Sequence, residues 1–477
     1  MGEPVRHARP PSPRTPKPST HATHLPDKAA LLGLIRQAIE QLPGALSVRV
    51  EVPVPPVDAR AWLAGQDAPI KTYWRDRDTG FETAAIGAAD IVTENTAPDG
   101  PAFSPVFDQL RRRLSCAHPD MRYYGGWAFD SAPATGPWAE FGSYRFVLPR
   151  FEMSIKGHRA VFACNARRTD PCDTETGEIG RQFDLLAPTA ADAPALPHLV
   201  AREDLPAREK WERLVANALQ AIERQTFDKV VLARKVRLRY AGPPNVSTLL
   251  GLLAQHARNA YLFAFQPEEG LAFVGATPER LYKNLGGYIK SEALAGTRPR
   301  GESAAADVNL GRDLMHNAKE LREHAIVADR IHGVLDQICR DLRVDSALSL
   351  IRLHRCQHLV RRFEGILANG YIDADVLAAL HPTPAVGGHP DAPALQWLRE
   401  NEPFRRGWYA GPIGWVGHDS SEFAIAIRSG LVCDDTLTLY AGAGIVAGSV
   451  PRTEWEETES KLAAFLDVLT QNDKKTR

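Results

Sequence analysis

Hydrophobic and polar positions near the start of the chain follow first a helical and then a strand period. Apolar residues at 31, 32, 34, 35 and 39 recur at helical spacing and predict a first helix. Residues 47–52 alternate with a period of two, which predicts a strand with one face in water. From there to about residue 200 the pattern indicates short strands punctuated by aromatic residues and glycine, as in residues 122–129.

The periodicity becomes clearer after about residue 205. Apolar positions from Trp211 to Ile222 predict a helix. A longer helix is expected over about 313–340, where Leu314, Leu321 and Ile338 belong to one apolar stripe. Four strands are expected between these helices, at 227–234, 261–265, 271–274 and 288–297.

The C-terminal part is expected to contain a β-hairpin and a final helix. Residues 422–428 and 436–440 flank Asp434 and Asp435, a pattern that predicts the hairpin. Thr453 and Glu456 have the spacing of a capping box, which predicts that the last helix begins at Thr453. Strand-rich blocks mixed with peripheral helices favour an α/β fold of the α+β sandwich type over a strict βαβ alternation.

Composition divides the chain into three parts. Residues 1–26 are rich in proline and arginine and lack an apolar secretory core, so we expect a disordered tail. A basic organelle-targeting segment is the alternative there, although the prolines disfavour an amphipathic helix. Residues 27–200 are expected to form the N-terminal half of the fold, and the stretch rich in alanine and proline at 187–197 indicates a linker. The candidate chemistry concentrates in residues 205–472.

Charge and cysteine content narrow the class of protein. The chain has 477 residues, and 57 Lys+Arg against 58 Asp+Glu give a net charge of −1. This balance gives no broad electrostatic reason to expect nucleic acid or an anionic membrane as partner. There is no run of about 18 apolar residues, so no membrane helix is expected. The six cysteines are scattered without a CxxC pair, which favours reduced thiols in a cytoplasmic protein.

Two of the predicted helices each carry a pair of glutamates at i and i+3. Glu320 and Glu323 share one face of the first helix, and Glu454 and Glu457 share one face of the second. If the two faces meet, they form an oxygen-only site of the kind that suits Mg²⁺. Lys461 follows Glu457 on the same face. For either helix alone, solvated surface acids are the more common explanation.

A lysine and a glutamate are candidates for acid–base chemistry. Lys229 lies in an apolar strand, and burial there favours the neutral amine that can act as a general base. An edge-strand lysine that reaches water is the alternative. Glu279 follows Pro278 in a turn after a strand, where an apolar cleft can keep a carboxylic acid protonated as a general acid. Taken alone, this segment is more often a plain turn.

Glycine and arginine residues mark candidate anion-binding positions. In residues 292–298, Gly296 allows backbone amides to approach an anion closely. Arg428 ends an apolar strand and could clamp a carboxylate with two hydrogen bonds. The glycines at 442, 444 and 448 imitate a dinucleotide-binding fingerprint, but the spacing is GxGxxxG and too little chain follows for a second strand. We therefore expect no NAD site.

Taken together, these segments resemble the chorismate-binding enzymes, the family of isochorismate, salicylate, anthranilate and aminodeoxychorismate synthases. The resemblance covers roughly residues 205–470, and a looser one covers YYGGWAFD and FGSYRFVLPRFE within 120–155. It implies a large, twisted, mainly antiparallel β-core with helices packed outside. The similar blocks are FDKVVLAR, FVGATPERL, SEALAGTRPRG, KELREH, HPTPAVGG, SEFAIAIRS, LYAGAGIVAGS and EWEETESK.

The resemblance implies a role for each candidate residue. Lys229 matches the general base that activates water, and Glu279 matches the general acid that protonates a leaving hydroxyl. Glu323 and Glu457 match the Mg²⁺ ligands, with Glu320 and Glu454 as supporting carboxylates. The remaining positions match groups around the substrate chorismate: Gly296, Thr297, His358, Ala385, Tyr409, Arg428, Gly442 and Lys461.

Within this family, the sequence favours an isochorismate synthase. The resemblance implies a glutamine at the position of Lys229 in the aminating members, so the lysine of this chain favours water as the nucleophile. Salicylate synthases resemble this chain but carry threonine in the region of Ala385. Salicylate synthase and an aminating anthranilate or aminodeoxychorismate synthase remain the alternatives. The resemblance further implies a monomer without an amidotransferase subunit, and leaves open whether the product serves menaquinone, siderophore or salicylate synthesis.

Overall fold

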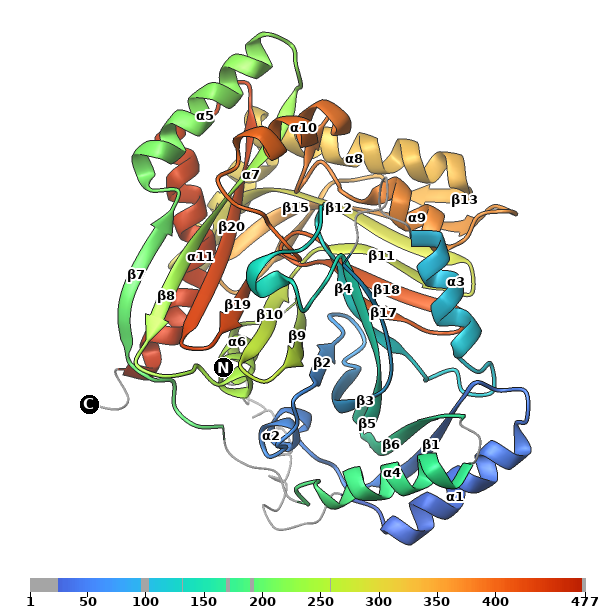
Figure 1. Cartoon of the computed structure of the whole chain (residues 1–477). Helices are drawn as coiled ribbons and strands as arrows, with labels where there is room; N and C mark the ends of the chain where they lie inside the picture. Colours follow the sequence, from blue (N-terminus) through green and yellow to red (C-terminus); the bar gives the residue numbers. More distant parts are fainter. Residues whose placement is uncertain are drawn as a thin grey trace, which may run out of the picture.

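The computed structural model describes residues 25–95, 103–130, 132–168, 172–188, 193–257 and 259–473. The disordered tail expected over 1–26 lies outside these ranges except for its last two residues, and so does part of the expected linker at 187–197. Among the described helices, none is long and apolar enough to cross a membrane. Figure 1 shows the helices arranged around the outside of a large, twisted sheet.

All strands of the described chain are hydrogen-bonded into one sheet of twenty strands, and every neighbouring pair is antiparallel. The expected mainly antiparallel α/β core is therefore confirmed. A first arm of the sheet comprises, in spatial order, β7 (Leu199–Leu205), β8 (Lys229–Tyr240), β20 (Thr436–Val446), β19 (Ser429–Cys433), β10 (Leu271–Thr277) and β9 (Tyr261–Glu268), with β16 (Gly388–His389) also paired to β8.

A second arm comprises β4 (Tyr123–Trp127), β17 (Pro412–Val416), β18 (Ser420–Ile425), β11 (Arg280–Leu285), β12 (Tyr288–Pro299) and β15 (Cys356–Leu367), which pairs with both β13 (Cys339–Val344) and β14 (Ser349–Arg352).

Strands from the first 200 residues connect the two arms. β2 pairs with β9 of the first arm, β3 pairs with both β2 and β5, and β5 pairs with β4 at the start of the second arm. The sheet is thus continuous across the whole described chain. These connecting strands are β2 (Lys71–Arg75), β3 (Glu82–Glu94) and β5 (Tyr144–Lys156), with β6 (Arg159–Arg167) and β1 (Ser47–Val54) added beyond β5.

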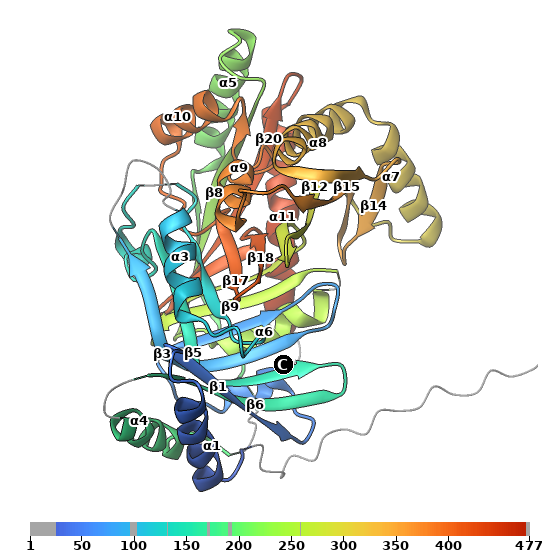
Figure 2. The same ribbon diagram turned by 90° about the vertical axis from the view of Figure 1, so that its right-hand side faces the viewer.

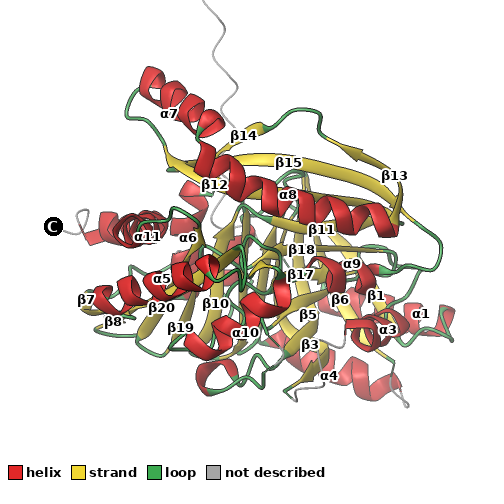
Figure 3. Ribbon diagram, turned by 90° about the horizontal axis from the view of Figure 1, so that it is seen from above, coloured by secondary structure: helices red, strands yellow, loops and turns green. Residues whose placement is uncertain are grey.

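The helices cover the outside of the sheet. Figure 2 shows α1 and α4 below β1 and β6, at the end of the molecule away from α5 and α10. Figure 3 shows α8 lying along β12 and β15 of the second arm. The described helices are α1 (Lys28–Gln41), α2 (Ala59–Ala64), α3 (Phe103–Arg113), α4 (Cys172–Asp184), α5 (Arg208–Glu223), α6 (Val246–His256), α7 (Ala304–His316), α8 (Ala318–Ile338), α9 (Asp373–Leu380), α10 (Asp391–Asn401) and α11 (Pro451–Asp473).

Three predicted elements differ from the structure in their boundaries. The single helix predicted over 313–340 is two helices, α7 and α8, separated at Asn317, whose side chain accepts hydrogen bonds from the backbone N–H groups of Lys319 and Glu320. The hairpin at Asp434 joins β19 to β20, because the strand predicted over 422–428 ends at Ile425. The last helix begins at Pro451, two residues before the predicted start.

The strand predicted with one wet face, β1, is buried on both faces at its beginning. Arg49, on the face expected in water, is 4% exposed. Its guanidinium donates hydrogen bonds to Asn165 of the neighbouring strand β6 and to Glu152 of β5, the next strand along. The alternation of apolar and polar residues therefore reflects one face of β1 packed in an apolar environment and one packed in a buried ionic environment. The prediction of a solvated face was wrong.

Candidate active site

A cavity lies where the two arms of the sheet meet α8 and α11, and it gathers most of the residues that the sequence singled out. Lys229, Glu320 and Glu454 stand behind its lining. Lys229 contacts Glu323, Glu320 contacts Thr297, and Glu454 lies one helical turn before Glu457. The predicted residues that line the cavity are Glu279, Gly296, Thr297, Glu323, His358, Ala385, Tyr409, Arg428, Gly442, Glu457 and Lys461.

Lys229 begins β8 and is completely buried. Its Nζ lies 3.1 Å from Oε1 of Glu323 on α8, so the ammonium has a carboxylate partner inside the protein. The neighbouring strand β20 makes room for this pair at Gly444, where a Cβ atom would lie 2.5 Å from Glu323 Oε1 and 3.1 Å from Lys229 Cε. The glycine that imitates a dinucleotide fingerprint therefore has a packing function.

Glu279 lies in the turn between β10 and β11 and is 4% exposed. Burial raises its pKa to about 8, and the nearby carboxylate of Glu292 acts in the same direction, against the opposing effect of Lys229 and Lys461. A carboxyl group with this pKa is protonated at neutral pH and can donate a proton. The turn that the sequence indicated thus holds a carboxylic acid in the state that a general acid requires.

The four candidate metal-binding glutamates are each paired with a cationic side chain. Lys229 contacts Glu323, as described above, and Lys461 Nζ lies 2.7 Å from Glu457 Oε1. Lys319 Nζ lies 2.7 Å from Glu454 Oε1, while the two oxygens of Glu320 accept from Arg298 and from the Thr297 N–H. Within the described ranges, no three His, Cys, Asp or Glu side chains meet in a metal-binding cluster.

The donors at this end of the cavity nevertheless fit a divalent cation. Glu454 is fully buried, and its Oε2 has no hydrogen-bond donor. Burial and the neighbouring Glu457 carboxylate raise the pKa of Glu454, so the two groups repel one another when both are ionised. A hard cation that prefers oxygen ligands would relieve this repulsion and supply the missing partner.

The cavity also presents hydrogen-bonding and cationic groups next to these glutamates. His358 Nδ1 lies 3.1 Å from Thr297 Oγ1 and 3.1 Å from the Gly296 carbonyl, so the imidazole is fixed against β12. Gly296 has a φ of +74°, and a Cβ there would lie 3.2 Å from Glu320 Oε2. Lys461 Nζ donates to the Gly442 carbonyl at 2.8 Å. These contacts hold Lys461 and His358 in place at the cavity wall.

Arg428 differs from the prediction in its local structure. It follows β18 rather than ending it, and its φ of 51° is unusual for a residue with a side chain. This left-handed turn lets the guanidinium line the cavity, where it lies 3.7 Å from Cys356 Sγ. The sulfur also lies 3.3 Å from His358 Nε2. Although burial opposes it, the interactions with His358 and Arg428 lower the pKa of Cys356 to about 6.

Among the polar side chains that line the cavity, two were not predicted. Arg406 is 3% exposed and donates hydrogen bonds to the carbonyls of Val231 and Val386 and to the Glu402 carboxylate. Tyr440 stacks on Tyr409 with ring centroids 4.9 Å apart. Arg406 sits in a charged, aperiodic segment that gives no sequence signal, whereas Tyr440 precedes the glycines of β20 and could have been found from that position.

A buried lysine, a protonated carboxyl group and two pairs of glutamates thus surround one cavity, an arrangement suited to an enzyme that performs acid–base chemistry on a small anionic molecule. The profile of the chorismate binding enzyme family matches residues 34–470, and the chain belongs to this family. It is 32% identical over 414 residues to isochorismate synthase MenF of Bacillus subtilis, covering 83% of this chain and 87% of that protein.

Two further comparisons agree. The chain is 35% identical over 371 residues to a chloroplastic isochorismate synthase of Catharanthus roseus, covering 76% of this chain and 64% of that protein. Its fold is similar to the solved structure of MenF, the menaquinone-specific isochorismate synthase from Escherichia coli, with a TM-score of 0.81 and 29% identity. That match covers 92% of this chain and 99% of the solved one. The resemblance read from the sequence blocks is confirmed.

Proposed function

We propose that this chain is an isochorismate synthase, which converts chorismate reversibly into isochorismate. The observation that carries the proposal is the combination of a buried lysine, Lys229, with a buried and protonated glutamic acid, Glu279, at one cavity. Water addition needs a base for the attacking water and an acid for the departing hydroxyl, and these two residues supply both functions. The family membership and the relatives described above support the same activity.

The cavity offers suitable contacts for chorismate, which carries two carboxylates. Arg428 and Lys461 provide positive charge, and the Arg428 guanidinium has the fork geometry that pairs with a carboxylate. Thr297 and His358 provide further hydrogen-bonding groups in the lining. Tyr409, stacked on Tyr440, offers an apolar face for the ring. We expect these groups to orient the ring between Lys229 and Glu279.

The proposed reaction consumes one water and releases one. Lys229 takes a proton from water as its oxygen bonds to C2 of the ring. The double bonds shift, the bond between C4 and its hydroxyl breaks, and Glu279 donates a proton to that leaving oxygen. Lys229 ends protonated and Glu279 ends ionised, so a proton must pass between them or through water before the next turnover.

Mg²⁺ is the cation that we propose for the two glutamate pairs, with Glu323 and Glu457 as ligands and Glu320 and Glu454 as supporting groups. Glu320 would act chiefly through β12, because both its oxygens already accept hydrogen bonds. When bound, the cation would neutralise the ring carboxylate of chorismate and remove the counter-charge that Glu323 offers to Lys229.

Two residues support isochorismate as the final product. Lys229 occupies the position where a glutamine is expected in the aminating enzymes. The lysine favours water over ammonia as the nucleophile. Ala385 lines the cavity in the region where a threonine is expected in salicylate synthases. The alanine favours release of isochorismate before pyruvate is eliminated. Salicylate synthase is the second candidate. We further propose that the chain acts as a cytoplasmic monomer without an amidotransferase subunit.

The test is chromatography of the products after incubation of the purified chain with chorismate and Mg²⁺, without ammonia or glutamine. Isochorismate in equilibrium with chorismate is expected, and the Glu279→Gln variant should form none. Salicylate together with pyruvate would replace the proposal with the second candidate. Turnover only after ammonia is added would show that water is not the nucleophile.

A further inference from the structure

Two residues outside the predicted site form a buried ion pair next to the turn that carries Glu279. Arg77 lies in the loop between β2 and β3, and Glu292 lies in β12 of the second arm. Their side chains are 5% and 1% exposed. The guanidinium contacts both oxygens of the carboxylate, with Nη2 2.9 Å from Oε2, so the pair is bidentate.

This pair holds the backbone on both sides of Glu279. Arg77 Nη1 also donates a hydrogen bond to the carbonyl of Pro278, the residue before Glu279. Glu292 Oε1 also accepts from the backbone N–H of Arg280, the residue after Glu279, at 3.1 Å. The turn therefore has one attachment to the arginine and one to the glutamate. A shift of either partner would move the Glu279 side chain.

The pair also sets the electrostatic surroundings of Glu279. Burial is the largest cause of the raised pKa of Glu279, and the negative charge of Glu292 is the second. Lys229 on β8 and Lys461 on α11 oppose it. Other polar or titratable groups that line the cavity with Glu279 are Thr297, Glu323, His358, Arg406, Tyr409, Arg428, Tyr440 and Glu457.

We propose that Arg77 and Glu292 are positioning residues for the general acid: they fix the turn that carries Glu279 and keep a negative charge beside its carboxyl group. The inference rests on the proposed function, since it assigns Glu279 the role of proton donor. It adds a contribution from the first 200 residues, because Arg77 reaches the site from the loop that follows β2. That strand pairs with β9, which places the loop beside the catalytic turn.

The test is the pH dependence of kcat in the Glu292→Gln variant. A general acid must be protonated, so activity falls as pH rises through the pKa of Glu279. Loss of the neighbouring negative charge should move this alkaline limb to lower pH by on the order of one unit, with little change in KM for chorismate. Glu364→Gln is the matched control, because Glu364 forms an exposed ion pair with Lys290 on the same arm. The alkaline limb of its kcat profile should lie at the same pH as in wild type.

The positional part of the proposal is tested with arginine variants. Arg77→Ala should lower kcat by on the order of tenfold while KM stays within about twofold, because a misplaced acid slows proton transfer without removing substrate contacts. Arg77→Lys should recover part of the loss, since it restores the charge but can reach fewer acceptors. Equal kcat values in Arg77→Ala and wild type would overturn the positional part.

A spectroscopic measurement separates this inference from the proposed function. The carbonyl stretch of protonated Glu279 is followed by infrared difference spectroscopy against pH, with Glu279→Gln identifying the band. In Glu292→Gln the band should disappear at lower pH than in wild type, whether or not the protein turns over chorismate. An unmoved titration in a variant that unfolds at the wild-type temperature would overturn the proposal, even if isochorismate synthase activity is confirmed.

Discussion

At the scale of single residues, the site depends on opposite demands on two buried groups. In the proposed mechanism, Lys229 must lose a proton to act as a base, and Glu279 must keep one to act as an acid. Burial raises the pKa of Glu279 and so favours its neutral form. The neighbours differ: Lys229 contacts Glu323, whereas Glu279 lies near Glu292. The neighbours of each residue therefore matter as much as its own identity.

Lys229→Ala tests the base. We expect turnover to fall by at least about a hundredfold, because general-base catalysis typically contributes that much or more. Chorismate binding in the presence of Mg²⁺ should persist, since Arg428 and Lys461 are unchanged. Product chromatography gives the rate and calorimetry gives the affinity. Turnover near the wild-type rate would assign the base to another residue.

Glu457→Gln tests the metal site. The substitution removes the negative charge that the cation would contact, so the Mg²⁺ concentration for half-maximal activity should rise by at least about tenfold. Glu456→Gln is the control, because Glu456 is 58% exposed and pairs with Arg452 on the surface of α11. Activity titrated with Mg²⁺ gives the measurement. Identical titrations for both variants would place the metal elsewhere.

Much of the site was predictable at this scale, because the candidate residues lie in contiguous blocks that resemble the family. Apart from Tyr440, the missed polar residues share a physical reason. Arg77 and Arg406 donate to backbone carbonyls, and Glu292 accepts from a backbone N–H group and pairs with Arg77. Such contacts depend on chain segments that meet only in the folded state. An isolated arginine in a sequence gives no sign of the carbonyl that it will contact.

At the scale of elements, the predicted helices and strands were mostly confirmed, and the errors occurred at boundaries. The break at Asn317 was missed because Leu314 and Leu321 lie on one apparent apolar stripe across both helices. The first strand of the hairpin was misplaced because the chain turns at Arg428, in a backbone conformation that side-chain periodicity does not reveal. Which strands pair across the sheet is set by tertiary contacts that no local pattern records.

The cap at Asn317 leads to a prediction for α8. Asn317→Ala should destabilise the protein by about 1 kcal/mol, because the first N–H groups of the helix lose their acceptor. The same change should lower activity, since Glu320 and Glu323 lie in the first two turns of α8. Ser303→Ala, which removes the equivalent cap of the peripheral α7, is the control for stability alone. Denaturant unfolding and product chromatography check the two effects.

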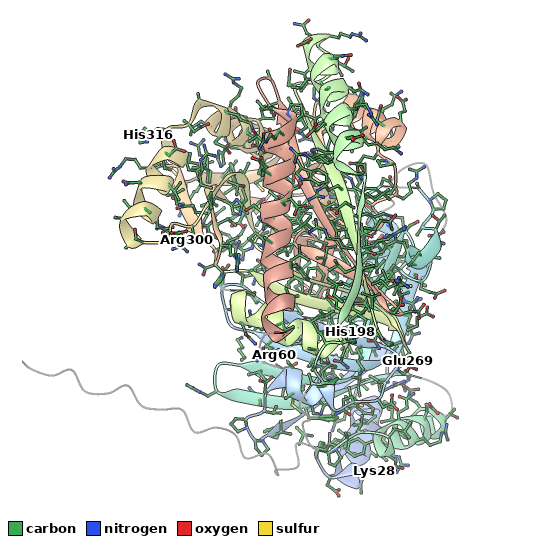
Figure 4. The ribbon with its side chains drawn as sticks, turned by 90° about the vertical axis from the view of Figure 1, so that its left-hand side faces the viewer. Lys28, Arg60, His198, Glu269, Arg300 and His316 are labelled. Atoms are coloured by element: carbon green, nitrogen blue, oxygen red, sulfur yellow. The ribbon has the colours of Figure 1, made fainter. Side chains whose placement is uncertain are left out.

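At the scale of the whole molecule, the active site occupies only part of the chain but depends on all of the sheet. Figure 4 shows the extent of the structure, with Lys28 at the bottom, α5 at the top and His316, on α7, at the upper side. Between these ends, β2 and β4 complete the edges of β9 and β17. Strands from the first 200 residues therefore complete the hydrogen bonding of the sheet that carries the site residues.

A fragment of residues 198–473 tests this dependence. It leaves β9 and β17 each without one strand partner, so we expect it to aggregate or to lack fixed tertiary packing. Near-ultraviolet circular dichroism and size-exclusion chromatography provide the measurement. Co-expression with residues 1–197 is the control and should restore a soluble complex. Cooperative unfolding and activity of the fragment alone would contradict the expectation.

The buried Glu279 also affects how the free energy of unfolding of the whole protein changes as the solution becomes more alkaline. Because its pKa is raised to about 8, the folded state keeps a proton that the unfolded chain releases at much lower pH. The unfolded state therefore gains relative to the folded state as pH rises through this interval, until the folded carboxyl also ionises near pH 8. The burial that prepares this group to donate a proton thus makes the enzyme less resistant to unfolding as its surroundings become more basic.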